Sequence, residues 1–120
     1  MNWKPDKGKP ICPQLCEQIC LAIAVGTYGP GGRLPSVREL AAAIGVNPNT
    51  VQHAMETLEL QGVLVSVRCN GWYVAEDISP AQQTLSRLRE DKTAVYFQDM
   101  ISLGMTAENI KQYVKEWEYE

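Results

Sequence analysis

Apolar residues recur at helical spacing along several stretches of this 120-residue chain. The clearest stretch follows Asn47, where positions i, i+3, i+4 and i+7 are Val51, Ala54, Met55 and Leu58. This spacing predicts an amphipathic helix with one buried stripe. Asn47 can cap it, Pro48 suits its first position, and Gly62 ends it. The polar residues on its other side are therefore available to a partner.

A shorter helix is predicted directly before this one. Ser36 can accept a hydrogen bond from the backbone of Glu39, and the Glu39 side chain can reach back to Ser36, which forms a capping box. Leu40 and Ile44 provide an apolar pair one turn apart, and Gly45 can adopt the positive φ that ends a helix. Two short helices joined by a tight turn predict a helix-turn-helix.

After Gly62 the pattern changes to two short runs rich in β-branched and aromatic residues, VLVSV and WYVA. Asn70-Gly71 lies between them, and Asn-Gly is a strong hairpin signal because both central residues of a type I′ turn need positive φ. The pattern therefore predicts a β-hairpin. The expected fold is mainly α with a small β-hairpin wing, a winged helix-turn-helix followed by a two-helix tail.

Helices are also predicted on both sides of this motif. Residues 10–25 carry isoleucine and leucine at near four-residue spacing and should form a first helix. Residues 28–32 are rich in glycine, but they do not follow a strand and lack the Lys-Ser/Thr of a phosphate-binding loop, which makes them a connector. Ser79-Pro80 opens a long helix that is interrupted near residues 90–92, and Thr106 caps a last helix after Gly104.

The two tail helices present apolar stripes. Helices of about 40 residues together cannot bury both stripes on one another and also enclose a ligand, so a second copy of the chain is the expected cover. The residues expected at this homodimer interface are Leu85, Leu88, Val95, Tyr96, Ile110, Tyr113 and Trp117.

The formal charge of −3 argues at first against nucleic acid. Residues 1–75, however, hold six Lys or Arg and five acids, about +1, whereas residues 76–120 hold five and nine, about −4. The acidity therefore lies in the tail, and Arg33, Arg38 and Arg68 lie at the helix-turn-helix and wing. The first residues do not form a signal peptide, and the longest apolar run, residues 20–25, cannot span a bilayer. A cytoplasmic protein without membrane partners is expected.

The segments GPGGRLPSVRELAAAIGVNPNTV, LELQG and RCNGWYV resemble the DNA-binding domain of GntR-type bacterial transcription regulators, from about Pro10 to Val74. The short helical tail resembles that of the YtrA subfamily, which uses the tail to dimerise and lacks a large effector-binding domain. The resemblance implies a DNA-binding domain over residues 1–77 and a dimerisation tail over residues 78–120. It also implies a homodimeric regulator, a repressor that binds a near-palindromic operator in double-stranded DNA.

Polar residues of the two short helices and the wing are the DNA-binding candidates. The resemblance aligns Arg38 with an arginine that contacts DNA, and amide side chains such as Gln52 suit adenine edges. The full set is Arg33, Ser36, Arg38, Asn47, Asn49, Thr50, Gln52, His53, Arg68, Asn70 and Gly71. Pro48 stands where the family often has Arg, so no operator sequence can be carried over. An ordinary solvated helix face remains the alternative for these positions.

Cys12, Cys16 and Cys20 share one face of the first helix. Either they pack as small apolar residues or, with Cys69, they sense a metal or an oxidant. No metal or cofactor is predicted, and one His without a nucleophile motif gives no enzyme site.

A second function class stays open beside DNA binding. In it the winged helix serves as a protein-interaction or small-molecule-binding module, with Trp72, Tyr113 and Trp117 lining the contact. The sequence also leaves open a small-molecule effector of unknown identity.

Overall fold

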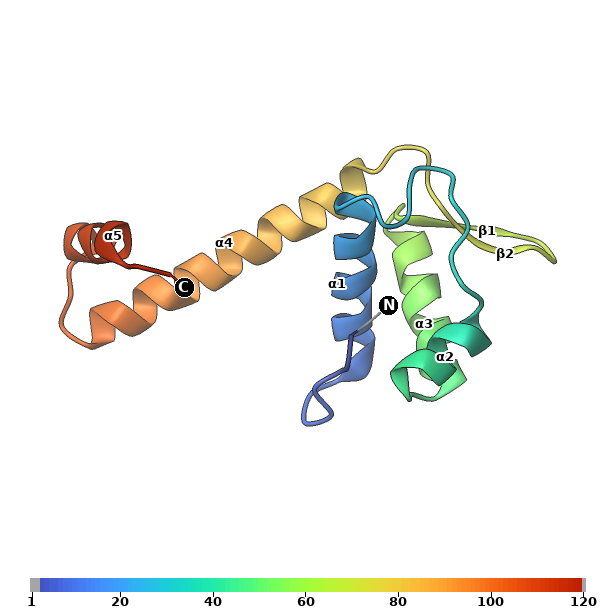
Figure 1. The fold of residues 1–120 in the computed structure, drawn as a ribbon, viewed down its shortest axis with the longest axis horizontal. Helices are drawn as coiled ribbons and strands as arrows, with labels where there is room; N and C mark the ends of the chain where they lie inside the picture. The colour runs from blue at the N-terminus through green and yellow to red at the C-terminus, as the bar shows by residue number, and fades with distance from the viewer. Residues whose placement is uncertain (1–2, 120) are drawn as a thin grey trace. The chain divides into compact units, whose positions relative to one another are not determined.

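The computed structural model describes residues 3–119 (Figure 1). Its elements in chain order are α1 (Ile11–Ala24), α2 (Val37–Ile44), α3 (Pro48–Leu60), β1 (Leu64–Val67), β2 (Gly71–Val74), α4 (Ser79–Ser102) and α5 (Ala107–Glu116). This order confirms the predicted winged helix-turn-helix and helical tail. The chain divides into two compact units, of which unit 1 runs to Leu85 and unit 2 begins at Ser86.

The core of unit 1 is formed by α1, α2, α3 and the hairpin. The predicted stripe of α3 is confirmed, because each of its members has no exposed surface: Val51, Ala54, Met55 and Leu58. From α1, Leu15 and Ile19 are equally buried, and Leu40 of α2 is 1% exposed. The three helices therefore hold one another through apolar contacts, with the polar side of α3 left outside.

Local capping fixes both ends of α2 and the start of α3. The Ser36 Oγ accepts a hydrogen bond from the Glu39 N–H at 3.1 Å, and the Glu39 carboxylate accepts one from the Ser36 N–H at 3.2 Å. Gly45 ends α2 with φ 77°, and the Asn47 side chain accepts from the Asn49 N–H at 2.8 Å. The capping box, the glycine stop and the Asn47 cap are thus confirmed.

The hairpin differs from the predicted Asn-Gly turn. Val67 pairs with Gly71, so three residues connect the strands, and the Asn70 N–H donates to the Val67 carbonyl at 2.8 Å. The positive φ falls on Cys69, at 66°, and on Gly71, at 94°. The type I′ turn with Asn70 at a central position is therefore wrong, because the register places Arg68 and Cys69 at the centre.

The connector before α2 pairs with the wing. Arg33 forms an isolated antiparallel bridge with Tyr73, and the Leu34 N–H donates to the Trp72 carbonyl at 2.9 Å. The Gly32 carbonyl also accepts from the Val74 N–H at 2.8 Å, and the Gly31 N–H donates to the Val74 carbonyl at 3.0 Å. The connector thus holds β2 in place, a role that its glycine-rich sequence does not predict.

Helix α4 starts at Ser79, as predicted, but the cap comes from Asp77. The Asp77 Oδ1 accepts from the Ser79 N–H at 2.9 Å and from its hydroxyl at 2.6 Å. The expected interruption at residues 90–92 is wrong, since α4 is continuous there. Ala81 and Leu85 are buried in unit 1. A cut at the predicted domain boundary, after Asp77, would therefore remove part of the core of unit 1.

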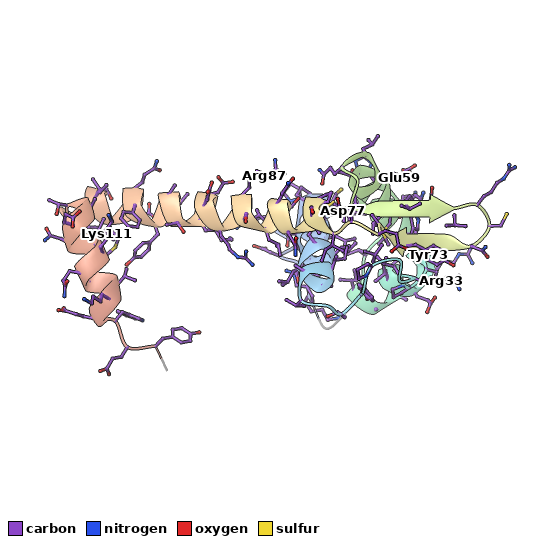
Figure 2. The ribbon with its side chains drawn as sticks, turned by 90° about the horizontal axis from the view of Figure 1, so that it is seen from above. Arg33, Glu59, Tyr73, Asp77, Arg87 and Lys111 are labelled. Atoms are coloured by element: carbon purple, nitrogen blue, oxygen red, sulfur yellow. The ribbon has the colours of Figure 1, made fainter. Side chains whose placement is uncertain are left out.

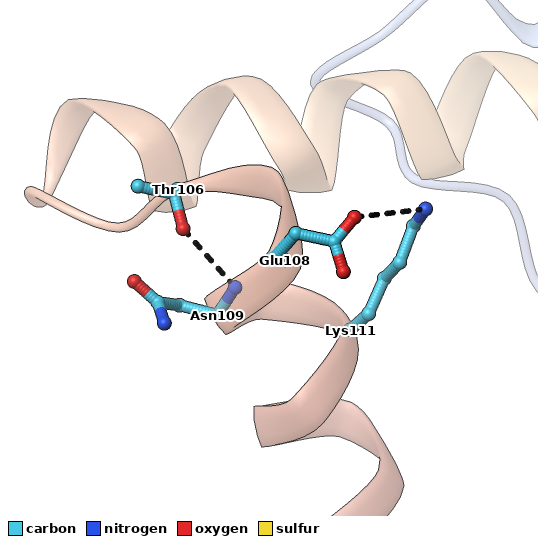
Figure 3. Close-up of polar contacts among 4 residues, drawn as sticks. All are labelled: Thr106, Glu108, Asn109 and Lys111. Carbon is cyan, nitrogen blue, oxygen red and sulfur yellow. Dashed lines mark hydrogen bonds and ion pairs between the residues drawn. The ribbon is translucent and has the colours of Figure 1, made fainter.

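Unit 2 contains the rest of α4 and α5. Thr106 caps α5 by accepting from the Asn109 N–H at 3.2 Å, and Glu108 pairs with Lys111 at 3.8 Å (Figure 3). Ile110 has no exposed surface. Ile110 and Leu85 are thus buried within a single copy, which leaves them little surface for a partner, and the dimer interface itself stays a prediction.

The other stripe residues remain accessible. Leu88 is half-buried, and the exposed fractions of the rest are 55% for Val95, 37% for Tyr96, 44% for Tyr113 and 61% for Trp117.

No helix within residues 3–119 has the length and apolarity needed to cross a membrane.

Candidate nucleic-acid interface

The outward side of α3 carries polar side chains along its first two turns. Asn49, Gln52 and His53 are exposed, and Thr50 is half-buried. They lie opposite the fully buried stripe, which fixes the orientation of the helix in unit 1. An exposed amide near the amino end of such a helix can present donors and acceptors to the edge of a base pair.

Helix α2 adds Ser36 and Arg38 near its amino end. The two hydrogen bonds from Ser36 lower the pKa of the Glu39 carboxyl, so this carboxylate stays charged and keeps the capping box closed. The Ser36 Oγ accepts the Glu39 N–H in this box, and Ser36 itself is exposed. Arg38 is exposed in the first turn of α2.

The wing adds a second basic region. Figure 2 shows Arg33 close to Tyr73, with which it forms the isolated bridge. The Arg33 Nη2 lies 3.6 Å from the point that a Cβ on Gly71 would occupy, so the arginine side chain extends across β2. Arg68 and Asn70 are exposed at the turn of the hairpin.

None of these three arginines forms an ion pair within residues 3–119. Across residues 3–119 the ion pair between Glu108 and Lys111 is the only one, and it lies in unit 2. The guanidinium groups of Arg33, Arg38 and Arg68 are therefore available to phosphate. Arg38 in particular forms no ion pair within this range.

A polar contact between α3 and β1 was not predicted from the sequence. The Glu59 Oε2 accepts from the Ser66 hydroxyl at 2.6 Å and from the Ser66 N–H at 3.2 Å. Glu59 and the hairpin are seen together in Figure 2. Two hydrogen bonds to one carboxylate fix the wing relative to the carboxyl end of the recognition helix.

All the predicted DNA-binding residues belong to unit 1, and they lie in α2, α3, their caps or the wing, except Arg33, which lies in the connector before α2. Thr50 is half-buried, and the others are exposed: Arg33, Ser36, Arg38, Asn47, Asn49, Gln52, His53, Arg68, Asn70 and Gly71. The structure thus keeps the candidates accessible, while their contacts with DNA stay a prediction.

Two cysteines of α1, Cys16 and Cys20, have the properties of packing residues. Burial raises the pKa of the Cys16 thiol to about 12, with Cys12 acting in the same direction. Burial also raises the pKa of Cys20, which has no exposed surface. Among residues 3–119, no three His, Cys, Asp or Glu side chains are grouped closely enough to hold a metal ion. A half-buried Cys16 and a buried Cys20, both with raised thiol pKa values, favour packing over thiolate chemistry for these two residues.

A helix-turn-helix with an exposed polar recognition helix and a two-stranded wing defines a winged helix-turn-helix transcription regulator. The profile described as "Bacterial regulatory proteins, gntR family" matches residues 14–74, which is just over half of the chain. The chain belongs to the GntR family.

Three similar proteins illustrate this membership. The "HTH-type transcriptional repressor YtrA" of Bacillus subtilis is 32% identical over 93% of this chain and 87% of its own. The structure of a "GntR family transcriptional regulator from Listeria monocytogenes" has a TM-score of 0.84 at 37% identity, covering 95% of this chain and 100% of that one. The DNA-binding domain of AraR "in complex with operator ORX1" has a TM-score of 0.59 at 30% identity, covering 61% and 95%.

Proposed function

We propose that this protein binds a specific operator in double-stranded DNA as a homodimer and represses transcription. The observation that carries the proposal is the division of α3 into a fully buried stripe and an exposed face of unpaired amides. The AraR domain supports it, because that similar fold was solved on its operator. The repressor role rests on the similarity to YtrA.

The two kinds of side chain on this face have different roles. Arg38 and Ser36 contact phosphates or a guanine edge beside the major groove, and they orient unit 1 on the duplex. Gln52 and Asn49 read adenine edges. Arg68 at the wing enters the minor groove, where a narrow groove attracts arginine.

Dimerisation is assigned to unit 2. Its helices leave an open apolar groove of ≈ 630 Å³. The residues that line this groove are Lys92, Thr93, Tyr96, Phe97, Met100, Tyr113, Val114 and Trp117. Exposed aromatic side chains of this kind are typical of interface anchors, and a two-fold dimer brings two recognition helices to successive major grooves about 34–36 Å apart.

Selection of bound sequences from a pool of random duplexes tests the proposal, with a pool carried through without protein as the control. The expected result is one sequence present as two inverted half-sites, with centres about 10 bp apart. A promoter carrying that sequence should be more active in cells that lack the protein. Failure to enrich any sequence over the control pool would contradict operator binding, and enrichment of a single unpaired half-site would contradict the dimer.

The rival proposal is a docking module lined by aromatic residues. Trp72 cannot line its contact surface, because this side chain is only 8% exposed and belongs to the core of unit 1. Tyr113 and Trp117 do line the groove, so a small molecule there is the competing occupant to the second copy. Sedimentation of the free protein separates the two, because a dimer forms without any added ligand.

A further inference from the structure

A basic segment precedes α1 and has no role in the DNA contacts described so far. We propose that this basic arm, residues 4–10, is an additional phosphate-binding surface that extends the DNA interface beyond the helix-turn-helix and wing. The proposal rests on the DNA binding proposed above. The arm carries Lys4, Lys7 and Lys9, and all three side chains are exposed.

A single glutamine of α1 holds the arm in a defined loop. The Gln14 Nε2 donates to the carbonyl groups of Asp6 at 2.9 Å, Lys9 at 3.3 Å and Pro10 at 2.9 Å. Its Oε1 accepts from the Asp6 N–H at 2.8 Å. The Lys9 N–H closes the turn onto the Asp6 carbonyl at 3.2 Å. The backbone of the arm is therefore already ordered, which reduces the entropy that would be lost on binding.

The charge of the arm is available to an anion. The Asp6 Oδ1 is engaged by the Gly8 N–H at 3.0 Å, and none of the three lysines forms an ion pair within residues 3–119. Three Lys and one Asp leave the arm at about +2. The described part of unit 1 has six basic residues, so half of its positive charge lies here.

The position of the arm matches the face proposed for DNA. Helices α1 and α3 pack side by side, and the Cys16 thiol donates to the Ala54 carbonyl at 3.6 Å. Figure 1 shows both helices beginning at the same end of unit 1, the end at which α2 lies and beyond which the turn of the arm projects. The turn of the arm thus lies at the end of unit 1 from which α3 would enter the major groove, where the flanking phosphates run.

The arm would add phosphate contacts to an interface that otherwise has few. Three arginines alone give few phosphate contacts per copy, and phosphate contacts supply most non-specific affinity. They carry little sequence information. Removing the arm should therefore weaken binding to all duplexes alike and reduce its salt dependence.

The test compares variants of the full chain on two fluorescent probes, a mixed-sequence duplex and the sequence that the parent selects from a random pool. The variant Lys4→Gln, Lys7→Gln, Lys9→Gln removes the charge of the arm, and a second variant replaces the same residues by Arg. The matched control Arg89→Gln, Lys111→Gln, Lys115→Gln removes the same charge from unit 2, outside the proposed interface. Affinity is measured between about 50 and 200 mM salt.

Loss of three phosphate contacts should reduce the slope of log affinity against log salt by about 2.7 per copy. The parent should then lose about 40-fold more affinity per copy over this salt range than the Gln variant. The ratio of the affinities for the two duplexes should stay at the parent level. The Arg variant and the unit 2 control should keep the parent slope.

A Gln variant with the parent slope would overturn the arm alone, as would an equal loss in the unit 2 control, which would assign the effect to net charge. A parent protein that binds neither duplex would instead overturn the proposed function, and the arm with it.

Discussion

Replacing Trp117 by alanine should break the proposed dimer and leave each copy folded. Trp117 follows α5, and 61% of its surface is exposed in one copy. Its ring lies 5.8 Å from that of Tyr113, and both border the apolar groove of unit 2. A side chain this exposed contributes little to the fold of its own chain. If a second copy covers it, it contributes mainly to association.

The expected magnitude follows from the exposed area. A tryptophan presents about 250 Å², so the exposed part is about 150 Å², which corresponds to about 4 kcal/mol at 25 cal/mol per Å². Alanine retains part of that contact, which leaves a loss of about 2–4 kcal/mol per copy. Because both copies lose it, the dimer dissociation constant should rise about 1,000-fold or more.

Sedimentation velocity over a dilution series measures this constant. Leu60→Ala is the matched control, because Leu60 is 90% exposed but lies in unit 1 at the end of α3. It should dimerise like the parent. If Trp117→Ala associates as tightly as Leu60→Ala, with unchanged circular dichroism, the groove of unit 2 is not the dimer interface.

Three further predictions concern unit 1. Ser66→Ala should lower the free energy of unfolding by about 1 kcal/mol in urea titration, since it removes the hydroxyl bond to Glu59; an unchanged midpoint would show that this contact does not hold the wing. The folded pKa of Glu39 lies below its ordinary value, so its contribution to stability is present above about pH 4.5 and is lost as the pH falls through the lowered pKa; Glu39→Gln should therefore lose less melting temperature than the parent between about pH 5 and 3, and parallel curves would contradict the capping role. At neutral pH iodoacetamide should modify the exposed Cys69 well before Cys16, whose pKa of about 12 keeps it protonated; mass spectrometry showing Cys16 modified first would contradict its burial.

Local rules predicted those parts of the fold that depend on neighbouring residues. The buried stripe of α3 follows from its spacing, and the capping box needs only Ser36 and Glu39, three residues apart. The candidate DNA-binding residues of α3 were placed outside for the same reason, because they alternate with that stripe. Exposure could thus be predicted one residue at a time, and the structure confirms it for all but the half-buried Thr50.

Contacts between distant segments could not be predicted in this way. The pairing of Arg33 with Tyr73 and the bonds from Ser66 to Glu59 depend on how the connector, the wing and α3 meet. The Asn-Gly pattern predicted the hairpin but not its register. In the observed register the positive φ expected at Asn70 occurs at Cys69 instead. A helical stripe predicts that Ile110 is buried, but spacing does not tell whether its own chain or a second copy covers it.

The central claim is that the exposed face of α2 and α3 binds DNA, with phosphate contacts from Arg38 and base contacts from Gln52. The most direct test titrates the selected operator and a scrambled duplex with Arg38→Ala and Gln52→Ala at two salt concentrations, after circular dichroism shows both variants folded. Arg38→Ala should weaken binding to both duplexes by about 1–3 kcal/mol per half-site and reduce the salt slope, whereas Gln52→Ala should lower only the preference for the operator. Parent-like affinity and salt slope for Arg38→Ala, with an unchanged operator preference for Gln52→Ala, would contradict the placement of DNA on this face.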